Sequence, residues 1–197
     1  MATELDAMKG ECYATASHFA NNSAFEVQRT NHFEVVINLA PLKLDGDTGE
    51  AFADHIRMSV KEIGAPKITA EAITLKHGNH AVKVAAAPTF EDLQITVYDT
   101  LGTDQIKLLQ SWFDKVFDHR TKLMGQVKDY KTDAFLYMYS PDCKKMRTWH
   151  LMGVWPKDFG QASGFSFDSA DAQTIQFTLS TDSYWEDEGK GEFGTSV

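Results

Sequence analysis

The chain has 197 residues, of which 43% are hydrophobic, and it carries a formal net charge of −9. This length and composition suit one folded domain with its own core and argue against wholesale disorder. No apolar run approaches the ~20 residues of a transmembrane helix, and residues 1–10 lack the apolar segment of a secretory signal, so we expect synthesis and assembly in a cytoplasm. The acidic balance argues against tight DNA binding, but it fits a surface past which DNA slides, or simply a soluble surface.

The first sixty residues are predicted to form an arm followed by two strands. Residues 1–30 are rich in Ala, Ser, Asn and charge without a sustained period, which is typical of an arm. Apolar side chains alternate over residues 33–39 and predict a strand. A loop with an acidic Asp-Gly-Asp turn follows at residues 41–49. A second strand is predicted from the alternating side chains of Ile56, Met58 and Val60.

A long hairpin or an extended excursion that turns at Gly78-Asn79 is predicted over residues 64–88. Aliphatic side chains lie on both sides of Gly78-Asn79, and these two residues favour a tight turn. The next segment alternates apolar Leu93, Ile95 and Val97 with polar neighbours, which predicts a further strand.

One helix is predicted after that strand. Thr103 is a suitable N-cap, and cations follow at the C-terminal end, where they suit the helix dipole. The apolar stripe repeats at spacings of three and four and consists of Ile106, Leu109, Trp112, Phe113, Val116 and Phe117.

The last third of the chain returns to strands. Residues 134–139 and 146–155 flank an evident hairpin turn, and residues 174–181 alternate again before a polar tail. The whole pattern therefore predicts a mainly β protein, an antiparallel sandwich or barrel with one flanking helix.

Several residue groups could carry chemistry, and each also has a simpler structural interpretation. His77 and His80 have a spacing that a metal site could use, but they flank turn residues and have no third ligand nearby in sequence. Two pairs of carboxylates, Glu91 with Asp92 and Asp168 with Asp171, could act in acid–base catalysis, although acidic residues are common at strand ends.

A nucleophile and its base could be formed by Cys143 and His150 across the hairpin, but Cys143 lies at a turn rather than in a cleft. The sequence contains no nucleophile elbow, phosphate loop, dinucleotide fingerprint or zinc-protease motif. Three tryptophans could stack on bases, but they suit core or interface anchors better; they are Trp149, Trp155 and Trp185. We therefore expect no catalytic, cofactor or metal site.

Three segments in order resemble the tail tube proteins of contractile-tailed, myovirus-type bacteriophages. The first is residues 89–99 (TFEDLQITVYD) followed by the amphipathic helix, and the second is residues 153–156 (GVWP). The third is residues 174–179 (TIQFTL) running into residues 182–186 (DSYWE). The resemblance covers roughly residues 30–186.

The resemblance implies a structural protein without enzymatic activity. Its subunits form homohexameric rings, each lending strands to a continuous barrel around a lumen, and the rings stack into a tube within the contractile sheath. Such closure removes free sheet edges. The implied tube domain is 31–186, with 64–88 as the loop that reaches the neighbouring ring. The arm at 1–30 is longer than the family pattern, and the polar tail at 187–197 is additional.

The implied location is the tail of a virion, assembled in the host cytoplasm, with a channel for DNA ejection. The implied partners are further copies of the chain, the sheath protein, the tape-measure protein, the baseplate and the tail terminator. DNA passes without specific binding, and no membrane anchor is expected.

Candidate assembly and channel residues follow from this resemblance and from the sequence pattern. Exposed aliphatic residues of the loop and aromatic residues near the chain's end suggest an assembly interface, namely Gly64, Pro66, Ile68, Ile73, Leu75, Trp155, Tyr184 and Trp185. Polar positions on alternating strands are candidates for the lumen, namely Gln94, Thr96, Thr174, Gln176 and Thr178.

The two cysteines suggest a covalent link between subunits. Cys12 lies in the predicted arm and Cys143 at a hairpin tip, and virions leave the reducing cytoplasm. We hypothesise a disulfide from Cys12 of one subunit to Cys143 of a neighbour; free thiols and an intramolecular bridge are the alternatives. For the chain as a whole, a tube of a tailocin or other injection system is the main alternative, and a small β-fold enzyme or binding module is another.

Overall fold

The computed structural model describes residues 28–42, 44, 49–101, 105–158, 160, 167–168 and 171–187. Thr103, the predicted N-cap, and Cys12 lie outside these described residues. The elements in chain order are β1 (Phe33–Ile37), the 3-10 helix η2 (Ala40–Leu42), α3 (Gly49–Ser59), β2 (Val60–Ile63), β3 (Ile68–His77), β4 (His80–Phe90), β5 (Leu93–Tyr98), α4 (Gln105–Val116), α5 (Val127–Tyr130), β6 (Thr132–Tyr139), β7 (Lys145–Pro156), β8 (Thr174–Ser180) and β9 (Ser183–Asp187).

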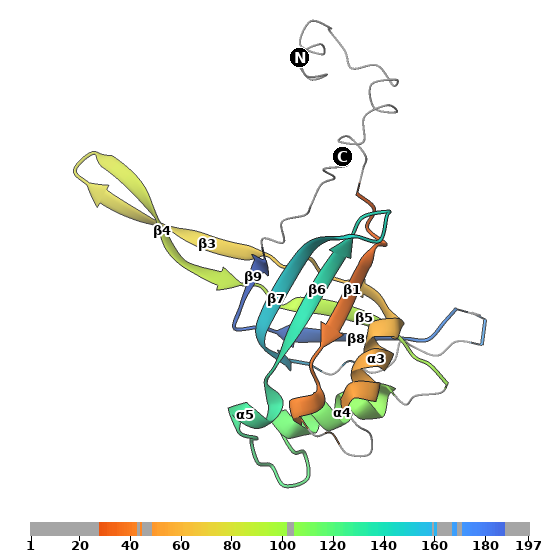
Figure 1. Cartoon of the computed structure of the whole chain (residues 1–197). Coiled ribbons are helices and arrows are strands. Elements are labelled where there is room, and N and C mark those ends of the chain that lie inside the picture. Colours follow the sequence, from red (N-terminus) through yellow and green to blue (C-terminus); the bar gives the residue numbers. More distant parts are fainter. Residues whose placement is uncertain are drawn as a thin grey trace, which may run out of the picture.

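Two antiparallel sheets share the long strand β7. Its first part pairs with β6 and β9, and β6 also pairs with β1. Its last two residues pair with β8, which continues through β5 to β2. Figure 1 shows β1, β6 and β7 crossing in front of β5 and β8. The mainly β, antiparallel sandwich or barrel predicted from the sequence is therefore confirmed.

The core lies between these sheets and is closed by helices. Alternate residues of β5 and β8 point inward, with Ile95, Ile175 and Phe177 almost completely buried. The predicted amphipathic helix is confirmed as α4, which buries Leu109 and Trp112. The Trp112 indole Nε1–H donates to the Tyr130 carbonyl at 2.9 Å, so the buried polar atom is satisfied and α5 is tied to α4.

The strand predicted at Ile56, Met58 and Val60 was wrong. Residues 49–59 form α3, and β2 begins only at Val60. Within the helix Ile56 is 1% exposed whereas Met58 is 86% exposed, so the two side chains do not share a face. Three alternating apolar residues cannot separate a strand from a helix end, and Ala51 and Ala53 before them favour a helix.

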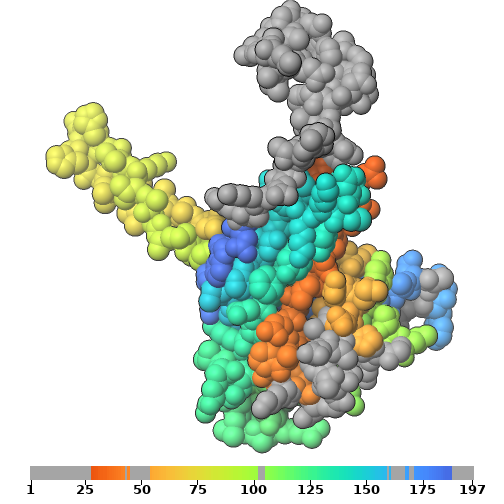
Figure 2. Space-filling model, in the orientation of Figure 1, coloured from red at the N-terminus to blue at the C-terminus, as the bar shows by residue number. Residues whose placement is uncertain are grey.

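The predicted hairpin is confirmed as β3 and β4. The strands pair from Ile68–Phe90 to His77–His80, leaving Gly78-Asn79 as a two-residue loop. Gly78 has φ +60°, as the first central residue of a type II′ turn requires. These strands form a separate two-stranded sheet that projects away from the body (Figures 1 and 2).

Candidate assembly surfaces

The outer half of the β3–β4 hairpin has one aliphatic face. Cross-strand pairing places Ile73 opposite Val84 and Leu75 opposite Val82, and successive pairs on one face are two residues apart. These four side chains are 40–57% exposed. We call them the aliphatic face. Such a contiguous exposed set is typical of an interaction surface.

The opposite face of the hairpin is small, polar and basic. It contains the pairs Ala72–Ala85, Thr74–Lys83 and Lys76–Ala81. Residues 72–85 include Lys76 and Lys83 but no Asp or Glu. The hairpin tip is therefore cationic in a chain whose net charge is −9.

The five lumen candidates lie together on the outer face of β5 and β8. The register pairs Gln94 with Thr178 and Thr96 with Gln176, while Thr174 is opposite Tyr98. Asp158 lies at the edge of this face, where its carboxylate accepts a hydrogen bond from the Thr178 hydroxyl at 2.8 Å. The β5–β8 pairing therefore brings the five candidates together on one polar surface.

An aromatic row crosses the outer face of the other sheet. Phe135 on β6 stacks on His150 on β7, with 4.5 Å between ring centroids and 11° between planes. His150 meets Trp185 on β9 edge-to-face at 4.4 Å. We call Phe135, His150 and Trp185 the aromatic row. The sequence reasoning missed it as a unit, although the alternation of aromatic residues along β6 was a usable signal.

The aromatic row continues along β6 through Tyr137 and Tyr139. The Lys145 ammonium lies 3.8 Å from the centre of the Tyr137 ring, within cation–π range. The Tyr139 hydroxyl donates to Glu34, which also pairs with Arg57. Burial first, and then the Glu34 carboxylate, raise the pKa of Tyr139 to about 12.

The remaining interface candidates have different environments. Trp185 is exposed, but its neighbour Tyr184 is 6% exposed and packs edge-to-face on Phe90. Tyr184 therefore belongs to the core of the single chain. Trp155 is half-buried against Tyr130. The Gly64 N–H donates to the Gln94 carbonyl, Pro66 is half-buried, and Ile68 is exposed at the base of the hairpin.

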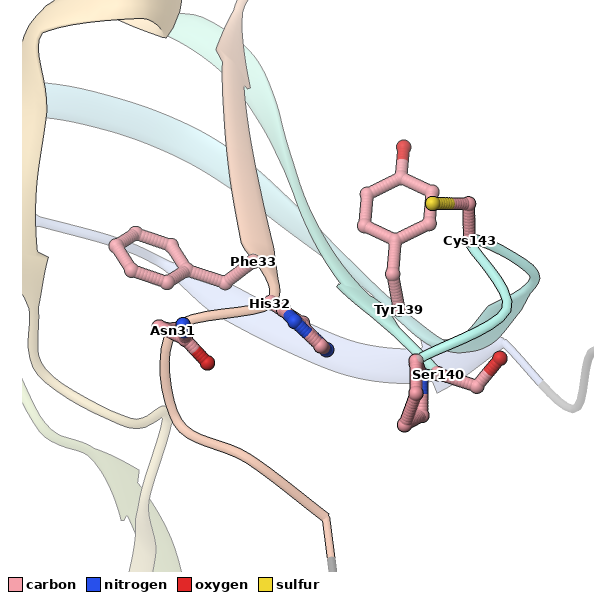
Figure 3. Close-up of a pocket in the computed structure, with 7 residues that line it drawn as sticks. Asn31, His32, Phe33, Tyr139, Ser140 and Cys143 are labelled. Carbon is pink, nitrogen blue, oxygen red and sulfur yellow. The ribbon is translucent and has the colours of Figure 1, made fainter.

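A pocket of about 310 Å³ opens where the chain enters β1 beside the β6–β7 turn (Figure 3). His32 and Phe33 line one side, and Tyr139 and Cys143 come from the hairpin. The Cys143 thiol is free and exposed, and its backbone has φ +60°. The structure thus places one of the two cysteines on the surface.

The groups considered for catalysis are not assembled into a site. Glu91 pairs with Lys67 at 2.7 Å, and Asp92 pairs with Lys157 at 2.6 Å. The Lys157 hydrogen bond lowers the pKa of the Asp92 carboxyl. Asp168 and Asp171 are both exposed. Glu91 and Asp92 are thus each paired with a separate lysine, and Asp168 and Asp171 lie on the surface.

Cys143 and His150, which were considered as a nucleophile and base but not expected to be one, do not lie together. His150 lies opposite Phe135, five residues beyond Lys145, the first residue of β7, which places it roughly 16 Å along the strand from that end. His77 and His80 close the hairpin turn as a cross-strand pair. Among the described residues, no group of three or more His, Cys, Asp or Glu could hold a metal ion. In the same part of the chain, no helix is long and apolar enough to span a membrane.

Comparison with known proteins identifies the class. Residues 29–185 match the family described as T4-like virus tail tube protein gp19. The match spans most of the chain, so the chain belongs to this family of structural tail tube proteins, which are not enzymes. No curated protein sequence matches the chain.

Solved structures with the same fold come from contractile injection systems. A chain of the sheath–tube complex of an extracellular contractile injection system, PVC, in its extended state is 14% identical with TM-score 0.60, and the alignment covers 88% of this chain and 98% of that one. A chain of the cap of the anti-feeding prophage, AFP, which terminates the tube, is also 14% identical, with TM-score 0.61 and coverages of 91% and 97%. At these identities the similarity establishes the fold.

Proposed function

We propose that this chain is the tail tube subunit of a contractile-tailed bacteriophage. Its copies form homohexameric rings that stack into a hollow tube inside the sheath, and the tube conducts DNA into the host. The observation that carries the proposal is the β3–β4 hairpin, whose aliphatic face projects from the body without cover among the described residues. In a family of tube proteins, such a hairpin is suited to joining one subunit to the next.

Sheet edges support closure into rings. The order β1-β6-β7-β8-β5-β2 ends on β1 and β2, and β9 forms a further edge beside β7. Open edges carry unpaired backbone groups and favour pairing with another chain. Lateral pairing of such edges in a ring uses those groups and makes the barrel around the lumen continuous.

The polar face of β5 and β8 is our candidate for the channel wall. Gln94, Thr96, Gln176 and Thr178 present neutral hydrogen-bonding side chains, with Thr174 at the end of the same face. Neutral groups attract phosphates less than lysines or arginines do, so DNA passes without being held. We therefore assign the luminal surface to the polar face of β5 and β8 and not to the aromatic row.

The partners of the proposed tube are those of a contractile tail. The similar structures come from a sheath–tube complex and a tube-terminating cap, and a similar fold also occurs in the anti-feeding prophage baseplate. We propose that this chain likewise contacts a sheath, a terminator and a baseplate, encloses a tape-measure protein, and is assembled in the host cytoplasm. Residues 31–186 form the tube domain, 64–88 the inter-ring element, and 1–30 and 187–197 the terminal segments.

A second candidate is the tube of a tailocin or another contractile injection system. Its support is the shared fold with PVC and AFP chains at TM-scores of 0.60 and 0.61. Both candidates predict the same assembled tube and differ in cargo. Purified particles separate them, because a phage tail is joined to a DNA-filled capsid whereas the other particles have no capsid.

The experiment that tests assembly compares the full chain with a hairpin-shortened variant in negative-stain images. Thr69 and Thr89 are paired and their hydroxyls lie 3.1 Å apart, so an Asn-Gly turn can replace residues 70–88 between them. We expect rings and tubes from the full chain, and a folded subunit that forms no tubes from the variant. Normal tubes from the shortened chain contradict the role of the hairpin.

A further inference from the structure

The aromatic row is an unusual surface for the outside of a sheet. Its three rings come from three adjacent strands and contact one another in sequence, with Phe135 and His150 half-buried and Trp185 42% exposed. Aromatic side chains, and tryptophan above all, are enriched at the centres of protein interfaces. No described part of this chain covers the row, so its exposed surface remains available to another molecule.

We propose that the aromatic row is the docking site for the aliphatic face of the β3–β4 hairpin of a second copy. This inference rests on the proposed tube and names the surface that receives its hairpin. The occupant is the aliphatic face of Ile73, Leu75, Val82 and Val84, which the subunit's own fold leaves exposed. Both surfaces expose apolar groups, so each can bury the exposed side chains of the other.

The dimensions of the two surfaces agree. Neighbouring strands lie about 4.8 Å apart, so a row across three strands spans roughly 10 Å between its outer members. The aliphatic face is two strands wide and two residue pairs long, which is roughly 5 by 7 Å between its Cα positions. The row can therefore underlie all four aliphatic side chains, and aliphatic–aromatic contacts are among the favourable pairs in β-structure.

Long-range charge favours the approach of the two copies, although the lysines of the tip point away from the row when the aliphatic face docks. Asp133 precedes Phe135 by two residues on β6, Asp187 follows Trp185 by two on β9, and both carboxylates are exposed. The hairpin tip supplies Lys76 and Lys83 on the face opposite its aliphatic residues. On the receiving surface, the Lys145 ammonium makes a cation–π contact with the Tyr137 ring. In a chain of charge −9, a cationic tip reduces the repulsion between copies where they meet.

The test is a crosslink between differently marked subunits that lack both native cysteines through Cys12→Ser and Cys143→Ser. One population carries Leu75→Cys and the other Trp185→Cys, and the mixture is oxidised after assembly. We expect a dimer band that disappears with reductant. The matched control is Thr74→Cys, the adjacent residue on the opposite hairpin face. Equal crosslinking from Thr74→Cys, or no crosslink in mixtures that form tubes, overturns the proposal.

A second measurement works in solution and separates failure of docking from failure of the tube. Sedimentation is used to compare the full chain with a Phe135→Ala/Trp185→Ala variant of unchanged circular dichroism. We expect at least a tenfold rise in the concentration needed for self-association. Association unchanged by these substitutions overturns docking on the row and leaves the tube intact. A full chain that stays monomeric counts against both the tube and the docking. The proposal is also overturned if this chain binds a sheath protein saturably but its copies do not associate with one another.

Discussion

Gly153 faces the side chain of Asp182 at the point where β7 passes from one sheet into the other. A β-carbon built on Gly153 would lie 2.3 Å from Oδ2 of Asp182, and Gly153 has φ +64°. The register shifts here, because Ala134 pairs with Leu151 whereas Thr132 pairs with Val154. The glycine thus allows a bulge that turns the strand, and Asp182 occupies the space that a side chain would need.

Gly153→Ala should lower the free energy of unfolding by about 2 kcal/mol, from left-handed backbone strain together with displacement of Asp182. Urea unfolding measures the change. The double variant with Asp182→Ala, compared with Asp182→Ala alone, removes the two closest contacts but keeps the β-carbon of residue 182 at 3.2 Å and the backbone strain, so it should lose less, about 1 kcal/mol. If Gly153→Ala leaves the free energy of unfolding unchanged in both backgrounds, this account of the bulge is wrong.

Trp112→Phe should destabilise the fold by about 2–3 kcal/mol, because it leaves a cavity and removes the indole hydrogen bond to the Tyr130 carbonyl. The matched control is Trp185→Phe at an exposed position, which should change the stability of the subunit by less than about 0.5 kcal/mol. Chemical denaturation of both variants makes the comparison. Equal losses would contradict the role of Trp112 as a buried, hydrogen-bonded core residue.

Alkaline conditions should weaken the contact of β1 with β6. The pKa of Tyr139 is raised to about 12, so folding favours its protonated form. The resulting stability is complete below pH ~10, the ordinary tyrosine value, and is lost as the pH rises to about 12. The slope of stability against pH in this window should decrease in Tyr139→Phe. An unchanged slope in that variant assigns the alkaline loss to other groups.

The candidate channel face can be tested by charge. Gln94→Lys with Gln176→Lys places cations on the polar face, and Gln110→Lys on the exposed side of α4 is the matched control. We expect all variants to form tubes and the face variant to slow DNA ejection severalfold, since lysines hold phosphates. An ejection rate equal to that of the control rejects this face as the channel wall.

The hypothesised disulfide between Cys12 and Cys143 of neighbouring subunits has a direct test. Cys143 is exposed, as such a bond requires. A non-reducing gel of intact particles should show multimers that collapse to monomer with reductant and are absent in Cys143→Ser. A bridge of this kind typically contributes ~2–4 kcal/mol against dissociation. A monomer band with both thiols open to alkylation rules it out.

Sequence patterns predicted the strands that alternate strongly and the helix with a long apolar stripe. Leu93, Ile95 and Val97 each occupy a core position in β5, and Gly78-Asn79 form the predicted turn. Short segments were less informative. The residues of α3 carried a brief alternation that imitates a strand, and β9 was not recognised because its pairing with β7 depends on residues distant in sequence.

For the surfaces too, local patterns were predictable from the sequence and long-range pairing was not. Period-two alternation places Gln94 and Thr96 on one side of β5, and likewise the three candidates of β8 on one side of that strand, but only the β5–β8 pairing joins the two sets into one face. The aromatic row required knowledge of which strands are neighbours and in what register, since Phe135, His150 and Trp185 come from three separate segments. The inward position of Tyr184 also depends on how β9 packs. On that strand Tyr184 points into the core and its neighbour Trp185 points outward.

The β3–β4 hairpin also sets the order in which the chain can fold during synthesis. Its strands are joined by two residues, whereas β5 must wait for β8, and about 90 residues separate the end of β4 from the end of β8. Hairpins form in ~1–10 μs, but ribosomes add ~5–20 residues per second. For several seconds, each nascent chain therefore samples a paired hairpin before its sandwich can close. On a crowded polysome, premature association between neighbouring nascent chains is the hazard that this order of synthesis creates.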